Sequence, residues 1–110
     1  MKPLVIVESP YAAPTEAGVE ANKQYARHAV ADSLARGEAP LASHLLLTQL
    51  LDDNDHAQRQ LGIEAGLAWY RVADKCVVYM DRGISEGMRE GMRRAVENGV
   101  QIEVRGIGGE

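Results

Sequence analysis

The stretch DKCVVYMDRGISEGM, from Asp74 to Met88, decides the fold that we expect for this chain of 110 residues. Cys76 to Met80 is a short apolar run with charged residues on both sides, which is typical of a central strand buried in a parallel sheet. Asp81-Arg82-Gly83 predicts a turn, and Ser85 is a good N-cap for the helix that follows. A helix that begins at the carboxyl end of a central strand is where α/β proteins bind anions and polar ligands.

The segment before this stretch predicts a strand, a helix and a second strand. Pro3 to Glu8 is an aliphatic, β-branched run, and Pro10 ends it because proline cannot continue a ladder. A helix is expected from Thr15 or Glu16 to Arg36, followed by Gly37. Its apolar stripe is expected at Ala26, Ala29, Val30 and Leu34, with Ser33 on the same face. The pattern then predicts a short second strand at 39–42 and a helical segment from Leu45 to Leu51.

A polar loop, a helix and a final strand complete the pattern. Asp52 to Asp55 predicts a solvated capping loop, since an EF-hand would need a central glycine and a distal glutamate in register. The helix is expected over 57–72, with Gly62 and Gly66 allowing close packing on the sheet. Its buried face is expected at Leu61, Ala65, Ala68, Trp69 and Val72. The final strand is expected to be half exposed, with Val100, Ile102 and Val104 on one face and Gln101 and Glu103 on the other.

This order of elements predicts an α/β fold, a three-layer Rossmann-like or flavodoxin-like sandwich with a parallel sheet of four to five strands. We expect a single domain over residues 1–105 and a flexible tail over 106–110.

The composition excludes several classes of function. The net charge is -4 and no basic block is present, so we expect no binding to nucleic acid polymers. One cysteine and three scattered histidines give no metal-ligand spacing, and no glycine-rich fingerprint predicts a cofactor. The apolar run Leu4 to Val7 is too short for a signal peptide, and no segment is long enough to cross a membrane. We therefore expect a cytoplasmic protein without a membrane partner.

Candidate site residues follow from the predicted topology, because the carboxyl ends of parallel strands face the ligand crevice. Ser9, Pro10 and Tyr11 follow the first strand, and Glu8 at its end is a further candidate. Ser43 and His44 lie near the second strand, and residues 81–88 follow the central one.

These residues resemble motifs of the nucleoside 2-deoxyribosyltransferase-like superfamily. Ser9-Pro10-Tyr11 resembles its G/S-P-[YF] loop, and Asn22 lies at a suitable distance in the following helix. Further matches are Gly37, Pro40 and Ser43-His44, then Ala73-Asp74 before the central strand, then Ser85, Gly87 and Met88 with Ala95 and Gly99. The resemblance covers nearly the whole chain and is closest to small, often phage-encoded members of the superfamily.

The resemblance implies cleavage of an N-glycosidic bond. In this superfamily a glutamate of the last major helix attacks the sugar C1′, and an aspartate, matched here by Asp74, assists the base. The register set by Ala95 and Gly99 places Gly91 at the nucleophile position, so Glu90 or Glu86 would have to substitute for it. The ligand-binding residues that the resemblance implies are Ser9, Pro10, Tyr11, Asn22, His44, Ser85, Gly87 and Met88, and Ser85 would hold a 5′-phosphate.

Three functions stay open from the sequence. The first is a deoxyribosyltransferase or nucleotide N-glycosidase, with Glu90 and Asp74 as catalytic residues. The second is a catalytically silent protein that binds or sequesters a nucleotide. The third is a scaffold or interaction protein. In the first two cases the partner is a small nucleoside or nucleotide. The aliphatic helices and half-exposed last strand also predict a homo-oligomer, a dimer or higher, since self-association would cover apolar surface.

Overall fold

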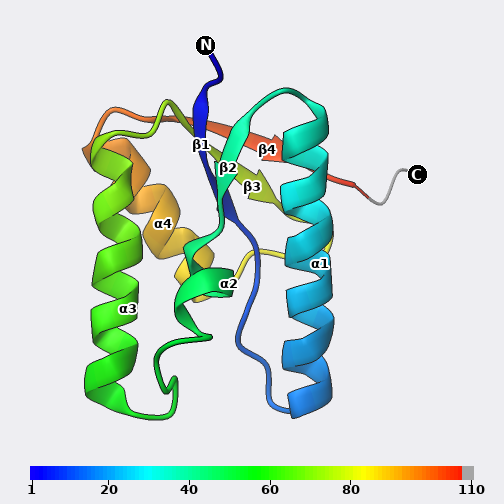
Figure 1. Ribbon diagram of the computed structural model, residues 1–110, viewed down its shortest axis with the longest axis vertical. Helices are drawn as coiled ribbons and strands as arrows, with labels where there is room; N and C mark the ends of the chain where they lie inside the picture. The colour runs from blue at the N-terminus through cyan, green and yellow to red at the C-terminus, as the bar shows by residue number, and fades with distance from the viewer. Residues whose placement is uncertain (108–110) are drawn as a thin grey trace.

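The computed structural model describes residues 1–107 and has the predicted α/β architecture, a parallel four-stranded sheet between two helical layers (Figure 1). The strands are β1 (Leu4–Glu8), β2 (Ala39–Leu41), β3 (Lys75–Tyr79) and β4 (Gln101–Arg105). The helices are α1 (Glu16–Ala35), α2 (Ser43–Leu47), α3 (His56–Ala68) and α4 (Glu86–Glu97), with a 3-10 turn at Trp69–Arg71. The strand order is β2-β1-β3-β4 with every pair parallel, so the predicted fold class is confirmed.

Different helices cover the two faces of the sheet. Alternation along β1 and β3 sends Val5, Val7 and Val77 toward α1, where they pack with Tyr25 and Ala29. The opposite face packs against α3 and α4. Its buried residues are Ile6, Leu67, Tyr70, Cys76, Val78, Met88, Ala95 and Val100. The central strand of the predicted stretch, β3, is therefore covered on both sides, as its continuous apolar run indicated.

Local signals set the helix ends. The Thr15 hydroxyl accepts a hydrogen bond from the Gly18 N–H at 3.0 Å, and the Ser85 hydroxyl accepts one from the Met88 N–H at 3.3 Å. Both residues are N-caps, which confirms the prediction for Ser85. Gly37, directly after the C-cap of α1, has a φ of 86°, a left-handed conformation that glycine adopts without strain.

The predicted buried face of α3 is wrong. Leu61, Trp69 and Val72 are exposed, whereas Gly66, Leu67 and Tyr70 are buried. The glycines decide the outcome, because a Cβ at Gly66 would overlap the Ser43 side chain and a Cβ at Gly62 would lie 3.1 Å from Leu51. The glycine side of α3 therefore packs closely on α2 and the loop after it, not on the sheet as we expected, and Leu61, Trp69 and Val72 turn outward.

The predicted stripe of α1 contains one error, and β4 is half exposed as predicted. Leu34 is exposed, while the hydroxyl residue Ser33 is fully buried because it donates to Glu38 at 2.7 Å. Val104 is 52% exposed, since β4 is an edge strand. Arg105, one residue later, is buried instead.

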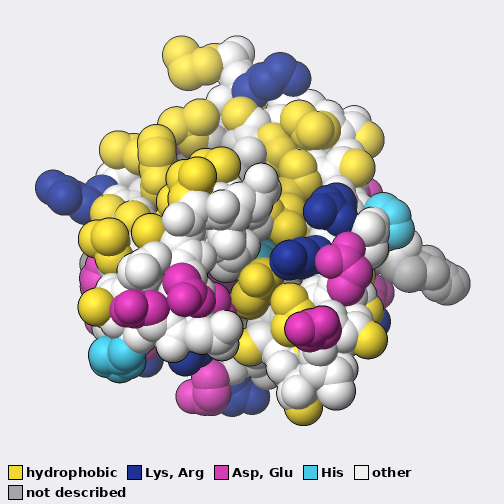
Figure 2. Space-filling view, turned by 60° about the horizontal axis from the view of Figure 1, so that its bottom comes forward, with side chains coloured by type: hydrophobic (Ala, Val, Ile, Leu, Met, Phe, Trp, Pro, Cys, Tyr) yellow, Lys and Arg dark blue, Asp and Glu magenta, His cyan; other side chains and the backbone are white. Residues whose placement is uncertain are grey.

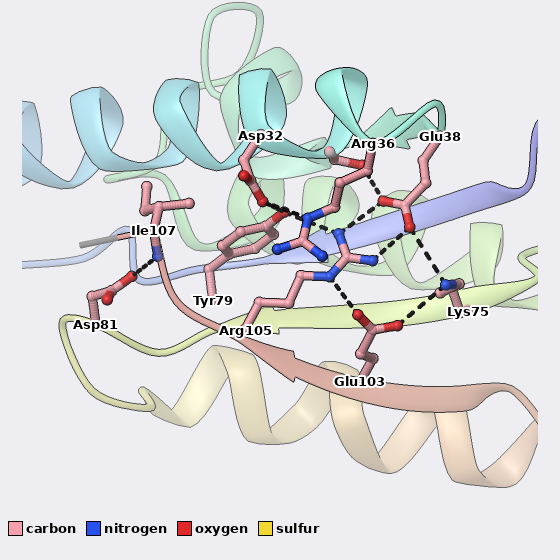
Figure 3. A network of polar contacts seen from close by, with 10 residues as sticks. Asp32, Arg36, Glu38, Lys75, Tyr79, Asp81, Glu103, Arg105 and Ile107 are labelled. Atoms are coloured by element: carbon pink, nitrogen blue, oxygen red, sulfur yellow. Dashed lines mark hydrogen bonds and ion pairs between the residues drawn. The ribbon is translucent and has the colours of Figure 1, made fainter. Parts of the chain in front are cut away.

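A buried ionic cluster explains why Arg105 lies inside (Figure 3). Its guanidinium donates to both carboxylate oxygens of Glu38, at 2.8 and 2.5 Å, and to Glu103 at 2.6 Å. Lys75 bridges the same two carboxylates at 3.4 and 3.2 Å. The hydrogen bonds from Arg105 lower the pKa of Glu38 to about 2. The cluster joins β3 and β4 to the residue that precedes β2, so it ties both halves of the sheet together.

The chain beyond β4 stays against the sheet at first. Ile107 packs beside the α1-side core, and its N–H donates to Asp81 at 2.8 Å. The rest of the predicted flexible tail lies outside the described residues. None of the helices within residues 1–107 combines the length and apolar character that crossing a bilayer requires.

Candidate functional site

A pocket of about 350 Å³ opens at the carboxyl end of the sheet, where β1, α2, α3 and α4 meet. This volume lies in the range of small-molecule sites. Figure 2 brings this end of the molecule forward and shows acidic side chains among hydrophobic ones. The chemistry-bearing residues that line the pocket are Glu8, Ser9, Tyr11, Ser43, His44, Asp53, Arg59, Tyr70, Ser85, Glu86 and Glu90. A pocket therefore lies at the carboxyl ends of the strands, the edge of the sheet at which the sequence analysis expects a site.

Glu8 is the most perturbed acid of the pocket. The Tyr70 hydroxyl donates to its Oε2 atom at 2.5 Å, and the Tyr70 oxygen lies 3.2 Å from the Cys76 sulfur. Burial raises the pKa of Glu8 to about 7, against the opposing effect of the Tyr70 hydrogen bond. Burial also raises the pKa of Tyr70 far above its usual range. Glu8 therefore exchanges a proton near neutral pH while Tyr70 keeps its own and acts as a fixed donor.

Gly91 explains how Glu8 fits beside α4. A Cβ placed on Gly91 would lie 2.5 Å from the carboxyl carbon of Glu8, closer than unbonded atoms pack. Gly91 is buried in α4, and Glu8, which a Cβ at position 91 would meet, lines the pocket. The Glu8 carboxylate thus occupies the space that any side chain at position 91 would enter. The sequence marked Glu8 only as a strand-end candidate, and the signal that links it to Gly91 is their proximity in space.

The loop after β1 and the start of α2 form a second polar group. The Ser9 hydroxyl and the His44 Nε2 atom are 3.1 Å apart, and the Tyr11 ring meets the His44 ring edge-on with centroids 6.1 Å apart. Burial lowers the pKa of His44 to about 4, so the imidazole is neutral at pH 7. A neutral imidazole and a hydroxyl can both donate and accept hydrogen bonds, which suits recognition of an uncharged polar ligand.

Asn22 and Pro10 support this loop without lining the pocket. The Asn22 amide donates to the Tyr11 carbonyl at 3.0 Å and accepts from the Arg82 Nε at 3.0 Å. Pro10 is buried. Both were predicted as ligand-binding residues, and neither is among the residues that line the pocket.

Asp74 is separated from the other predicted site residues. It lies at the amino end of β3, where its carboxylate accepts a hydrogen bond from the Leu4 N–H at 2.7 Å. The pocket is at the carboxyl end of the same strand, and five residues at about 3.3 Å each span roughly 16 Å. The fold therefore does not bring Asp74 to the cavity.

The start of α4 supplies the remaining wall. Ser85, Gly87 and Met88 all line the pocket, although the Ser85 hydroxyl is already engaged as the N-cap. Glu90 also lines it, but its carboxylate pairs with Arg93 one turn along the same helix. Of the two predicted catalytic carboxylates, Glu90 reaches the cavity wall and Asp74 does not.

No metal site accompanies this pocket within residues 1–107, where no group of three or more histidine, cysteine, aspartate or glutamate side chains could hold an ion.

A family model matches residues 3–105, which is nearly the whole chain. The chain belongs to the family described as a domain of unknown function, DUF7768. The matched range ends with β4, so this family domain includes every strand of the sheet and every wall of the pocket. No curated protein matches the chain.

Proposed function

We propose that this DUF7768 domain binds a nucleoside or nucleotide in the pocket and cleaves its N-glycosidic bond, with Glu8 as the nucleophile. The observation that carries the proposal is the position of the Glu8 carboxylate, which fills the space beside Gly91. The resemblance to the deoxyribosyltransferase-like superfamily implies a carboxylate at position 91, and Glu8 offers one from a strand to the same region. The residue type that the chemistry requires is therefore available in the pocket despite the glycine.

The proposed reaction follows from the contacts of Glu8. Tyr70 holds the Oε2 atom, and Oε1 attacks the sugar C1′ to form a glycosyl ester. The C1′–N bond breaks, and its electron pair leaves with the base, which takes up a proton from water. Water or a second base then attacks C1′, breaks the ester and returns Glu8 as a carboxylate. Because attack requires ionised Glu8, the rate rises with pH through about 7.

The remaining lining residues suit the substrate class. Tyr11 offers an aromatic ring for a base, and the Ser9–His44 pair offers hydrogen-bonding groups at the same wall. We infer that these residues orient the ligand and that Glu8 faces its glycosidic bond.

The test is release of free base from each common 2′-deoxynucleoside and its 5′-monophosphate, measured by chromatography. The unchanged protein is expected to release base, Glu8→Gln to lose that activity while its melting temperature still rises with ligand, and Glu90→Gln to retain activity. Loss in Glu90→Gln alone would move the nucleophile to Glu90.

A second candidate function is a silent binder, favoured by the burial that raises the pKa of Glu8 to about 7 and so opposes its ionisation at neutral pH. That function predicts a thermal shift with intact ligand in every sample. A scaffold predicts neither a shift nor free base.

A further inference from the structure

Acidic side chains outnumber basic ones on the pocket wall. Its acidic side chains are Glu8, Asp53, Glu86 and Glu90, and Arg59 is the one basic residue among the described residues that line it. Arg59 itself faces Asp53 at 3.9 Å, and Glu90 pairs with Arg93 from outside the wall. The burial that keeps His44 neutral prevents it from adding a positive charge at pH 7. Because Asp53 and Glu90 are paired and Glu8 is only partly ionised at pH 7, a phosphate group entering this pocket would meet like charge mainly at Glu86.

The start of α4 is the place where a phosphate would otherwise bind, since helix N-termini attract anions. Here the first turn carries Glu86, whose side chain is 95% exposed beside the pocket mouth. Its contact with Arg89 is long, at 3.9 Å, and both partners are exposed, so the pair neutralises little of its charge. The Ser85 hydroxyl caps the helix by accepting the hydrogen bond from the Met88 N–H, and its own O–H can still donate, so Glu86 is the group in this turn that opposes a phosphate. A carboxylate thus already stands at the positive end of the helix.

We propose that the pocket selects uncharged nucleosides over nucleoside 5′-phosphates, and that Glu86 is a specificity-determining residue for this choice. The inference rests on the proposed function, because it concerns the ligand of the same site. It reverses the phosphate-holding role that the superfamily resemblance implies for Ser85. A carboxylate in contact with a phosphate near a protein surface weakens binding by roughly tenfold, so Glu86 alone accounts for about that preference.

The experiment compares dissociation constants for matched pairs, each 2′-deoxynucleoside against its own 5′-monophosphate, by isothermal titration calorimetry at low ionic strength. The full chain is measured together with its Glu8→Gln variant, because the variant lacks the proposed nucleophile and therefore does not consume the ligand. The test variant is Glu86→Gln, and the control is Glu97→Gln, which removes an exposed charge from the last turn of the same helix. We expect the unchanged chain to bind the nucleoside at least tenfold more tightly than the monophosphate. Glu86→Gln should narrow that ratio by about tenfold, and Glu97→Gln should leave it unchanged.

The outcomes separate this inference from the function on which it rests. Equal or tighter binding of the monophosphate would overturn the selectivity while leaving the nucleotide pocket in place. An equal effect of Glu86→Gln and Glu97→Gln would overturn the role of Glu86, because it would show a response to net charge alone. Binding of neither ligand by any variant would overturn the proposed function and this inference together.

Discussion

The contact between Glu8 and Gly91 makes Gly91→Ala an informative substitution. In an ordinary helix this change is stabilising, by about 1 kcal/mol, because alanine has the higher helix propensity. At position 91 the new methyl group would overlap the Glu8 carboxylate, 2.5 Å from its carboxyl carbon. Glu8 would have to rotate away from Tyr70, or β1 and α4 would have to separate.

The expected magnitude combines two opposing terms. Overpacking of a filled site costs about 1–3 kcal/mol, and the propensity gain offsets about 1 kcal/mol of it. Gly87→Ala on the same helix is the matched control, since its Cβ would lie 3.9 Å from the Ser85 hydroxyl, an ordinary contact. We therefore expect Gly91→Ala to be less stable than Gly87→Ala by about 1–3 kcal/mol.

Urea unfolding followed by circular dichroism measures both variants against the unchanged chain. A second readout is the release of base, which Gly91→Ala should reduce because it displaces the proposed nucleophile. If Gly91→Ala were as stable as Gly87→Ala, the Glu8 carboxylate would not fill the space beside Gly91. The argument for Glu8 as the replacement carboxylate would then fail.

Three further predictions concern stability and association. Arg105→Met leaves Glu38 buried without its main partner and should lower the free energy of unfolding by about 3–5 kcal/mol in chemical denaturation, a loss that Glu38→Gln in the same chain should partly restore. The pKa of Glu38 is lower in the folded than in the unfolded chain, so its contribution to the free energy of unfolding is present above pH 4.5 and is lost as the pH falls toward 2. The pKa of Glu8 is shifted the opposite way, so its contribution is lost as the pH rises from 4.5 through 7. In a pH series of unfolding midpoints, Glu38→Gln should therefore flatten the change at acid pH and Glu8→Gln the change near neutral pH. Exposed Leu4, Trp69 and Val72 line an apolar groove of about 140 Å³, a surface that the homo-oligomer predicted from the sequence would cover. Trp69→Lys should therefore dissociate the oligomer, so that the mass measured by sedimentation falls toward the 12.0 kDa of one chain. An unchanged mass would place the contact between chains elsewhere.

Local patterns in the sequence were sufficient for the order and class of the elements. The aliphatic runs of β1 and β3, the N-cap at Ser85 and the left-handed Gly37 are signals within a few residues of the chain, and each lies where it was predicted. The parallel direction of the strands follows from the strand–helix alternation, because each intervening helix returns the chain to the edge at which the previous strand began. The position of the pocket follows in turn, since every strand ends at the same edge.

The faces of the helices required the tertiary structure. Hydrophobicity alone predicted that Leu61 and Trp69 are buried. The close approach of α2 and the following loop at Gly62 and Gly66 instead places the glycine side of α3 against them and leaves Leu61 and Trp69 exposed. Arg105 reads as an exposed strand residue until Glu38, 67 positions earlier, is placed opposite it. These outcomes depend on pairs that are distant in sequence, and a single chain carries no local signal for such pairs.

The sequence by itself determined a parallel α/β sandwich, the edge of the sheet at which the pocket lies, and a glycine where the resemblance implies a carboxylate. Only the tertiary structure decided which acid stands beside that glycine. It brought Glu8 there from β1 and held it with Tyr70, while it left Asp74 at the far end of β3. The physical reason is that the residue type fixes which chemical group a side chain carries, whereas its burial, its partners and its pKa depend on elements that meet only when the sheet and helices pack.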